Sequence, residues 1–158
     1  TSMIFWNPGD MNSNFTISIE EWHMIALEGV NVPVSFVING DSMRPLMRKG
    51  RDTVTAVPVY RDPKKGDIVV FARNDGEYVC HRIWRIKGDI AVTIGDACYG
   101  FDTPIHLSQV WGIVTKKETN GKEAKLDSAL SRAYGRLWMS LRRLRVIRRD
   151  IKRFLRKK

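Results

Sequence analysis

A serine, a histidine and an aspartate that together could activate a hydroxyl for nucleophilic attack lie on separate segments of this chain. Ser42 follows Asn39-Gly40, a tight-turn pair at the end of an apolar run. Such a turn can hold a hydroxyl clear of a sheet with a backbone N–H beside it. By itself the pattern is weak, because serines in turns more often cap or solvate the backbone. Ser42 is therefore a candidate nucleophile that needs a base elsewhere.

The base that would take the proton of Ser42 has to come from another segment, and the candidates are the three histidines and the lysines. Of the histidines, His81 has the most suitable position, in a strand-like run on the face that it shares with Val79 and Ile83. A histidine on an apolar face is more often a satisfied core residue. His23, on a predicted helix, and His106, in a predicted loop, are interpreted as structural or solvated. His81 is the candidate base.

A third group should orient the imidazole of the base and stabilise its charged form. The loop of residues 95–102 follows the strand after His81 and contains two carboxylates, Asp96 and Asp102. An aspartate after a glycine also serves ordinary turn chemistry. The residues alone leave open which of the two carboxylates orients His81.

Four short motifs in this order resemble the type I signal peptidase superfamily. They are Gly40-Asp41-Ser42-Met43-Arg44-Pro45, Lys65-Gly66-Asp67-Ile68-Val69-Val70-Phe71, Cys80-His81-Arg82-Ile83, and Thr93-Ile94-Gly95-Asp96 followed by Asp102. The resemblance covers about residues 30–118. It is to the Ser-His branch, which contains the archaeal and endoplasmic-reticulum signal peptidases and their bacterial relatives.

The resemblance implies a serine endopeptidase that binds its substrate as an extended strand. It implies Ser42 as the nucleophile, His81 as the general base, Asp102 as the aspartate that closes the triad, and Asp96 as the other acidic residue of that loop. The Ser-Lys branches, the usual bacterial signal peptidases and LexA-type repressors, place a lysine near the position of His81. Residues 77–83 contain no lysine, and the Gly-Pro-Gly-Asp segment of bacterial signal peptidases is missing. The Ser-His branch is therefore favoured.

Composition is typical of one globular domain with an appendage. The chain has 158 residues, 43% hydrophobic and 28% charged. No stretch approaches the ~18 apolar residues of a membrane span, and the first residues lack the pattern of a signal peptide. Cys80 and Cys98 do not form a disulfide framework or a metal site, and no metal or cofactor is expected.

Short β-type runs follow one capped helix. Ser18 and Glu21 have the spacing of a capping box and predict a helix from Ile19 to about Glu28, stopped by Gly29, with Trp22, Ile25 and Ala26 on its inner face. Strands are predicted at 34–38, 53–59, 68–72, 77–86, 90–94 and 110–116. With no helical run between them, these strands predict a mainly β, antiparallel and partly closed fold of the signal-peptidase and LexA type.

The predicted organisation has four parts. Residues 1–29 form an N-terminal segment with the short helix, 30–118 the catalytic domain, 119–127 a linker, and 128–158 a basic amphipathic helix. Residues 127–158 hold 12 Lys and Arg against 2 acidic residues, so the chain's net charge of +10 belongs to this tail. Its apolar residues recur at three- and four-residue spacing: Leu130, Tyr134, Leu137, Trp138, Leu141, Leu144, Ile147, Ile151, Phe154 and Leu155.

The tail therefore predicts binding to an anionic membrane surface. A protein partner or docking on the body of the domain is the second reading, and nucleic acid is disfavoured. The leading functional hypothesis is a peptidase that trims a leader or precursor peptide, in the cytoplasm or peripherally on the inner membrane face. An inactive peptide- or membrane-binding module is the alternative, as is a LexA-like regulator bound to nucleic acid, although no helix-turn-helix precedes the peptidase-like region.

Overall fold

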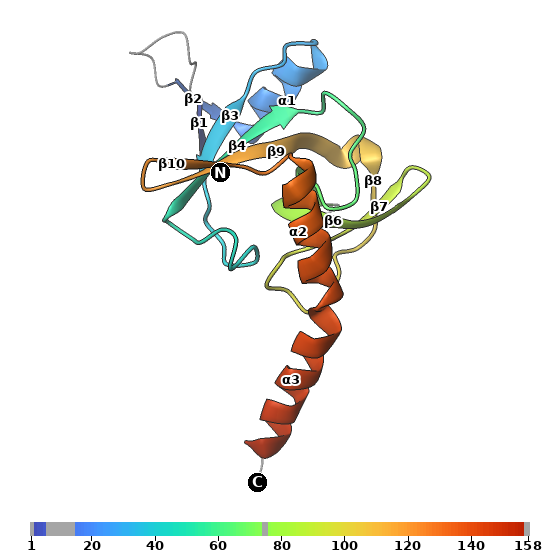
Figure 1. The fold of residues 1–158 in the computed structure, drawn as a ribbon. Coiled ribbons are helices and arrows are strands. Elements are labelled where there is room, and N and C mark those ends of the chain that lie inside the picture. The colour runs from blue at the N-terminus through green and yellow to red at the C-terminus, as the bar shows by residue number, and fades with distance from the viewer. Residues whose placement is uncertain (1, 6–14, 74–75, 157–158) are drawn as a thin grey trace.

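A curled, half-barrel antiparallel sheet forms the body of the protein (Figure 1). A computed structural model of the chain describes residues 2–5, 15–73 and 76–156. Within these ranges ten strands join in the order β2-β1-β3-β4-β9-β5-β6-β7-β8, and β10 pairs with β9. The mainly β, antiparallel prediction is confirmed. The strands are β1 (Ser2–Phe5), β2 (Phe15–Ser18), β3 (Val34–Val37), β4 (Asp52–Pro58), β5 (Ile68–Ala72), β6 (Tyr78–Lys87), β7 (Ile90–Ile94), β8 (Ile105–His106), β9 (Val110–Thr119) and β10 (Lys122–Lys125).

The predicted strands agree closely with those of the structure. β5 and β7 have the predicted bounds, β3 ends one residue earlier than predicted, and β4 and β6 are each shifted by one residue. The turn predicted at residues 74–76 falls partly outside the described residues, but β5 and β6 pair as the expected hairpin. At its end the N–H of Arg73 donates to the carbonyl of Glu77 at 2.8 Å, and the N–H of Gly76 donates to the carbonyl of Arg73 at 3.0 Å.

The segment expected to be a linker, residues 119–127, is different in the structure. β9 continues to Thr119, and β10 returns along it as a tight hairpin. Asn120 and Gly121 both have positive φ, 50° and 76°, which is the backbone that a two-residue hairpin turn requires and that Asn-Gly favours. All four residues of β10 are exposed, and the strand has no alternating apolar side chains. The hydrophobic pattern of the sequence therefore does not reveal this hairpin.

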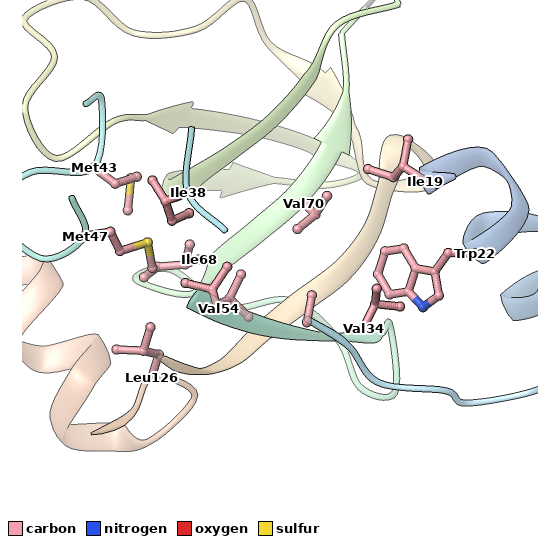
Figure 2. Packing of buried hydrophobic residues seen from close by; sticks show 12 residues of the cluster. Ile19, Trp22, Val34, Ile38, Met43, Met47, Val54, Ile68, Val70 and Leu126 are labelled. Carbon is pink, nitrogen blue, oxygen red and sulfur yellow. The ribbon is translucent and has the colours of Figure 1, made fainter. Parts of the chain in front are cut away.

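Helix α1 (Ile19–Leu27) covers one end of the sheet (Figure 1). The predicted capping box is present: the Ser18 hydroxyl accepts from the Glu21 N–H at 3.1 Å, and the Glu21 carboxylate accepts from the Ser18 N–H at 2.6 Å. Trp22 is buried against β3 and β9, as Figure 2 shows beside Val34. Its indole N–H donates to the Val32 carbonyl at 2.8 Å. Ile25 and Ala26 are only half-buried.

The basic tail forms two helices instead of one. α2 (Ala129–Ser140) and α3 (Arg142–Leu155) meet at Leu141. α2 lies beside the body and contacts β6, whereas α3 extends away from the sheet (Figure 1). Among the described residues, no helix is both long and apolar enough to cross a membrane. The first half of the tail thus docks on the body of the domain.

Candidate active site

Ser42 lies in a turn that two buried methionines hold against the core. The chain leaves β3 and forms a loop closed by bonds from the Ile38 N–H to the Asp52 carbonyl, 3.0 Å, and from the Gly50 N–H to the Ile38 carbonyl, 2.8 Å. The side chains of Met43 and Met47 are buried in the core (Figure 2). Ser42, between the exposed Asp41 and the buried Met43, is half-buried. The turn therefore keeps the hydroxyl-bearing residue at the edge of the core.

The far end of this loop is held by the buried carboxylate of Asp52. It accepts from the guanidinium of Arg51 at 2.7 Å, from the N–H of Arg48 at 2.9 Å and from the hydroxyl of Thr119 at 2.8 Å. The hydrogen bond from Arg51, with those from Thr119 and Arg48, holds the pKa of Asp52 well below its usual range despite the burial. The loop is thus pinned at both ends.

His81 lies on β6 and contacts Asp102. Its Nδ1 is 2.6 Å from Oδ2 of Asp102, which also accepts from the hydroxyl of Thr93 at 2.7 Å, while Oδ1 accepts from Arg73 at 2.6 Å. Burial opposes ionisation of Asp102, but the hydrogen bond and charge of His81, with the bonds from Thr93 and Arg73, keep its pKa below the usual value. Of the two candidate carboxylates, Asp102 is the one beside His81.

Asp96 has a different neighbour, the guanidinium of Arg82. Nε and Nη2 of Arg82 each donate to one oxygen of Asp96 at 2.8 Å, and Nη1 donates to the carbonyl of Gly66 at 2.9 Å. Both charged side chains are fully buried. This bidentate pair ties the loop of residues 95–102 to β6, so the geometry indicates a structural position for Asp96.

The Ser42 turn and the ring of His81 meet at Gly95. A Cβ on Gly95 would lie 2.6 Å from the carbonyl oxygen of Ser42 and 3.0 Å from Nε2 of His81. The N–H of Ala97 donates to the same carbonyl of Ser42 at 2.8 Å. Within the described residues no hydrogen bond joins the Ser42 hydroxyl to His81; such bonds are often long until substrate is bound. Glycine at position 95 is what permits the close approach.

Ser42 and His81 line one pocket of about 660 Å³. One wall is the chain from Phe36 to Gly40, and the other includes residues 78–80. β7 pairs with β6 only from Arg82 onward. Residues 78–81 of β6 therefore pair with β5 but not with β7, and they line the pocket. A pocket between two extended segments has the shape that a peptide strand requires.

Two thiols, Cys80 and Cys98, also line this pocket. Burial raises the pKa of Cys80 to about 12 and raises the pKa of Cys98 above its usual value. Both are therefore protonated near neutral pH, and a thiol is a much weaker nucleophile than a thiolate. Among the described residues, no group of three or more His, Cys, Asp and Glu side chains could hold a metal ion.

The other two histidines lie outside the pocket lining. His23 stacks on Trp111 with ring centroids 3.9 Å apart, and His106 hydrogen-bonds to Ser108 at 2.8 Å. Sequence reasoning missed Arg73 and Thr93, the further partners of Asp102. Thr93 belongs to the Thr93-Ile94-Gly95-Asp96 motif, so a signal for it existed, but nothing in the sequence around Arg73 distinguishes it.

Comparison with known proteins supports a peptidase domain. Residues 33–93, which include Ser42, His81 and both walls of the pocket, match the family model described as Peptidase S24-like. This part of the chain is therefore similar to Peptidase S24-like domains of the LexA and signal peptidase superfamily, and the match does not separate the branches of that superfamily. No curated protein and no solved structure matches the chain.

Proposed function

We propose that the protein is a serine endopeptidase of signal-peptidase type that cleaves a leader or precursor peptide through Ser42, His81 and Asp102. The observation that carries this proposal is the 2.6 Å contact between Nδ1 of His81 and Asp102, with Nε2 of the same ring beside the Ser42 turn. A carboxylate on Nδ1 holds the tautomer in which Nε2 can accept a proton.

In the proposed reaction Oγ of Ser42 attacks the scissile carbonyl carbon while Nε2 of His81 takes the hydroxyl proton. The backbone N–H of Ser42 is the candidate donor to the oxyanion. Collapse of the tetrahedral intermediate breaks the C–N bond, and His81 gives its proton to the leaving amine. Water then attacks the acyl-enzyme with His81 as the base, which releases the acid and restores Ser42. Asp102 stays ionised throughout and stabilises the imidazolium.

A Ser-His mechanism fits this pocket better than a Ser-Lys mechanism. A lysine base would have to reach the Ser42 hydroxyl, yet no lysine is among the described residues that line the pocket. The pocket's one cationic lining residue in that set, Arg73, is bound to Asp102 and cannot act as a base at neutral pH. These observations support the Ser-His branch as part of the proposal.

The proposed substrate is an extended peptide with small side chains near the cut. The walls of the pocket are mainly apolar, with Phe36, Ile38, Val70 and Val79 among the lining residues. A strand between Val37–Gly40 and the beginning of β6 would gain main-chain hydrogen bonds from exposed edges, and alternate side chains would enter the pocket.

The test is a proteome-derived peptide library incubated with the protein and read by mass spectrometry. We expect new peptide termini at a small set of related sites, with small side chains near the cleaved bond. Synthetic precursor peptides built on the best site then supply a quantitative assay. Absence of any enzyme-dependent cleavage over a broad range of pH would contradict the proposed activity.

We further propose that the tail holds the enzyme on an anionic membrane surface. Large apolar side chains stay exposed along α2 and α3, including Leu144 at 61% and Ile151 at 53%. Arginines and lysines occupy most remaining positions of α3. An apolar stripe flanked by cations suits the boundary of anionic headgroups and acyl chains. Exposed apolar residues of this stripe are Leu130, Tyr134, Leu137, Leu141, Leu144, Ile147, Ile151 and Leu155.

Flotation with phosphatidylglycerol vesicles tests this attachment. We expect binding that weakens with salt, little binding to phosphatidylcholine vesicles, and roughly tenfold or greater weakening in Leu144→Glu, because a buried leucine contributes about 1.5–3 kcal/mol. Lys125→Gln, on exposed β10, changes the net charge equally and is the control. Equal loss in both variants, or salt-sensitive binding to duplex DNA without vesicle binding, would contradict the membrane proposal.

A further inference from the structure

We infer that α2 is a positioning element of the active site, and that Trp138 on α2 positions the loop of residues 95–102 that carries Asp96 and Asp102. The catalytic part of this inference rests on the proposed function. The structural part does not: it rests on a continuous set of contacts that leads from α2 to the backbone of Ser42.

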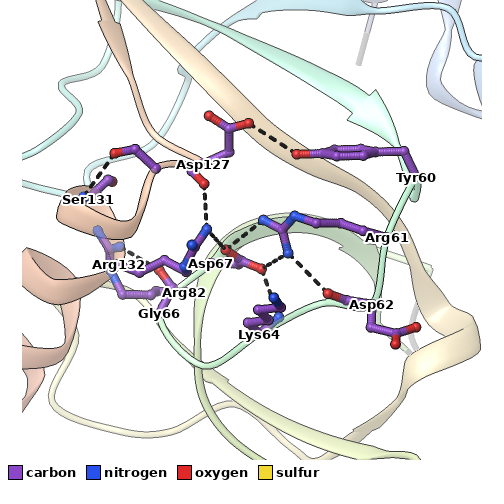
Figure 3. Close-up of polar contacts among 11 residues, drawn as sticks. Tyr60, Arg61, Asp62, Lys64, Gly66, Asp67, Arg82, Asp127, Ser131 and Arg132 are labelled. Carbon is purple, nitrogen blue, oxygen red and sulfur yellow. Dashed lines mark hydrogen bonds and ion pairs between the residues drawn. The ribbon is translucent and has the colours of Figure 1, made fainter.

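The first contacts fix the beginning of α2 on the body (Figure 3). The buried carboxylate of Asp67 accepts from Arg61 at 2.7 and 3.0 Å and lies 3.5 Å from the guanidinium of Arg132 on α2. A Cβ on Gly66 would lie 2.9 Å from the carbonyl oxygen of Arg132, and φ at Gly66 is +96°. The Lys65-Gly66-Asp67 motif therefore packs against the beginning of α2, because only a glycine at position 66 lets the backbone of Arg132 lie this close.

One turn further along, α2 lies directly on Arg82. A Cβ on Gly135 would lie 2.7 Å from Cζ and 2.8 Å from Cδ of Arg82. Arg82 has no freedom to move aside, since its guanidinium is held by Asp96 and by the carbonyl of Gly66. Gly135 is thus the close-contact point between α2 and the buried ion pair, and α2 helps to exclude water from it.

The third set of contacts reaches the loop itself. The indole N–H of Trp138 donates to the main-chain carbonyl of Asp96 at 2.8 Å. On α3, the guanidinium of Arg149 lies over the ring of Tyr99, 4.5 Å from its centroid. Both helices of the tail therefore hold a loop that has little regular structure of its own.

The loop passes this restraint to the catalytic residues. The residues on either side of Asp96 both touch the Ser42 turn: Ala97 donates its N–H to the Ser42 carbonyl at 2.8 Å, and Gly95 packs between that carbonyl and Nε2 of His81. Asp102 closes the loop and bonds to Nδ1 of His81. A shift of the Asp96 carbonyl would therefore move the nucleophile turn and the base relative to each other.

Trp138→Phe is the sharpest test, because it removes the donor and keeps an aromatic ring. We expect the Ala97 amide, measured by residue-resolved hydrogen exchange, to exchange about tenfold faster, since the carbonyl of Asp96 loses the hydrogen bond from the indole N–H. Amides of β4 and β9 should be unchanged. For cleavage of a peptide found by the library screen, kcat should fall about tenfold with KM little changed, because the substrate walls are intact. Leu137→Ala, at the exposed neighbouring position, is the matched control.

Gly135→Ala provides a second and independent variant. Alanine favours a helix over glycine by roughly 1 kcal/mol, so an undocked α2 would leave this variant unchanged or more stable. If α2 is docked on Arg82, Gly135→Ala should instead lower the stability of the protein. Exchange at the Ala97 amide should also be faster, as in Trp138→Phe. Unchanged exchange at Ala97 in both variants would overturn the inference, and so would equal acceleration at all amides. Failure of the wild-type protein to cleave any peptide would overturn the proposed function while the exchange data still judge the positioning.

Discussion

Ser42→Ala is expected to abolish peptide cleavage while the protein stays folded. Removal of the nucleophilic oxygen leaves no acyl-enzyme route, and the loss in comparable triads is roughly 10⁴-fold or more in kcat. The stability cost should be small, because Ser42 is half-buried and its hydroxyl has no hydrogen-bond partner among the described residues. Initial rates on a peptide from the library screen, with thermal unfolding in parallel, measure both effects.

His81→Ala should abolish cleavage to a similar extent, and the double variant should be no slower than either single variant. A base without its nucleophile, or a nucleophile without its base, contributes almost nothing, so the effects are not additive. Ser108→Ala and His106→Ala, on the exposed turn before β9, are matched controls and should keep the wild-type rate. Wild-type cleavage by either Ser42→Ala or His81→Ala would exclude the triad.

Asp102→Asn is expected to lower kcat by about 10²–10⁴-fold. An amide carries no charge to stabilise the imidazolium of His81, and its NH₂ group can favour the tautomer with the proton on Nε2. The loss of charge also leaves Arg73 without its carboxylate partner at Oδ1. The measurement is kcat for the same peptide substrate, corrected for the folded fraction.

Asp96→Asn is the matched control in the same loop. It should lower stability more, and activity less, than Asp102→Asn does. Its carboxylate holds the buried Arg82 and does not contact His81 in the described hydrogen bonds. Breaking a buried ion pair by neutralising one partner typically costs about 3–5 kcal/mol. We therefore expect a large loss of stability in urea denaturation, and more activity per folded molecule than Asp102→Asn retains. The reverse pattern would place the orienting role on Asp96.

The stabilisation from Asp102 should also depend on pH in a defined direction. The pKa of Asp102 is lowered in the folded protein, so its carboxylate stabilises the fold above the unfolded value of about 3.9. This contribution is lost as the pH falls through the lower, folded value. The difference in unfolding free energy between wild type and Asp102→Asn should therefore shrink below about pH 4. A difference that grows on acidification would contradict the lowered pKa.

Local patterns in the sequence predicted most of the sheet and the helix α1. The capping box at Ser18 and Glu21, the β-type runs and the turn glycines each depend on neighbours a few residues away, and the structure contains the elements that they predict. The same kind of signal was present at Asn120-Gly121, where the hairpin of β9 and β10 replaces the expected linker. Its exposed strand has no alternating apolar face, which is why only the turn pair could have revealed it.

The sequence by itself also determined the chemical groups available, a serine in a turn, a histidine on a strand and two aspartates in one loop. Only the tertiary structure decided which aspartate contacts which side chain. β6 pairs with β7 from Arg82 onward, Arg82 binds Asp96, and His81 contacts Asp102. The amphipathic pattern of the tail likewise predicted helix but not its break at Leu141 or its docking. That docking depends on Gly135 meeting Arg82 and Trp138 meeting Asp96, contacts between residues more than forty positions apart that no local pattern encodes.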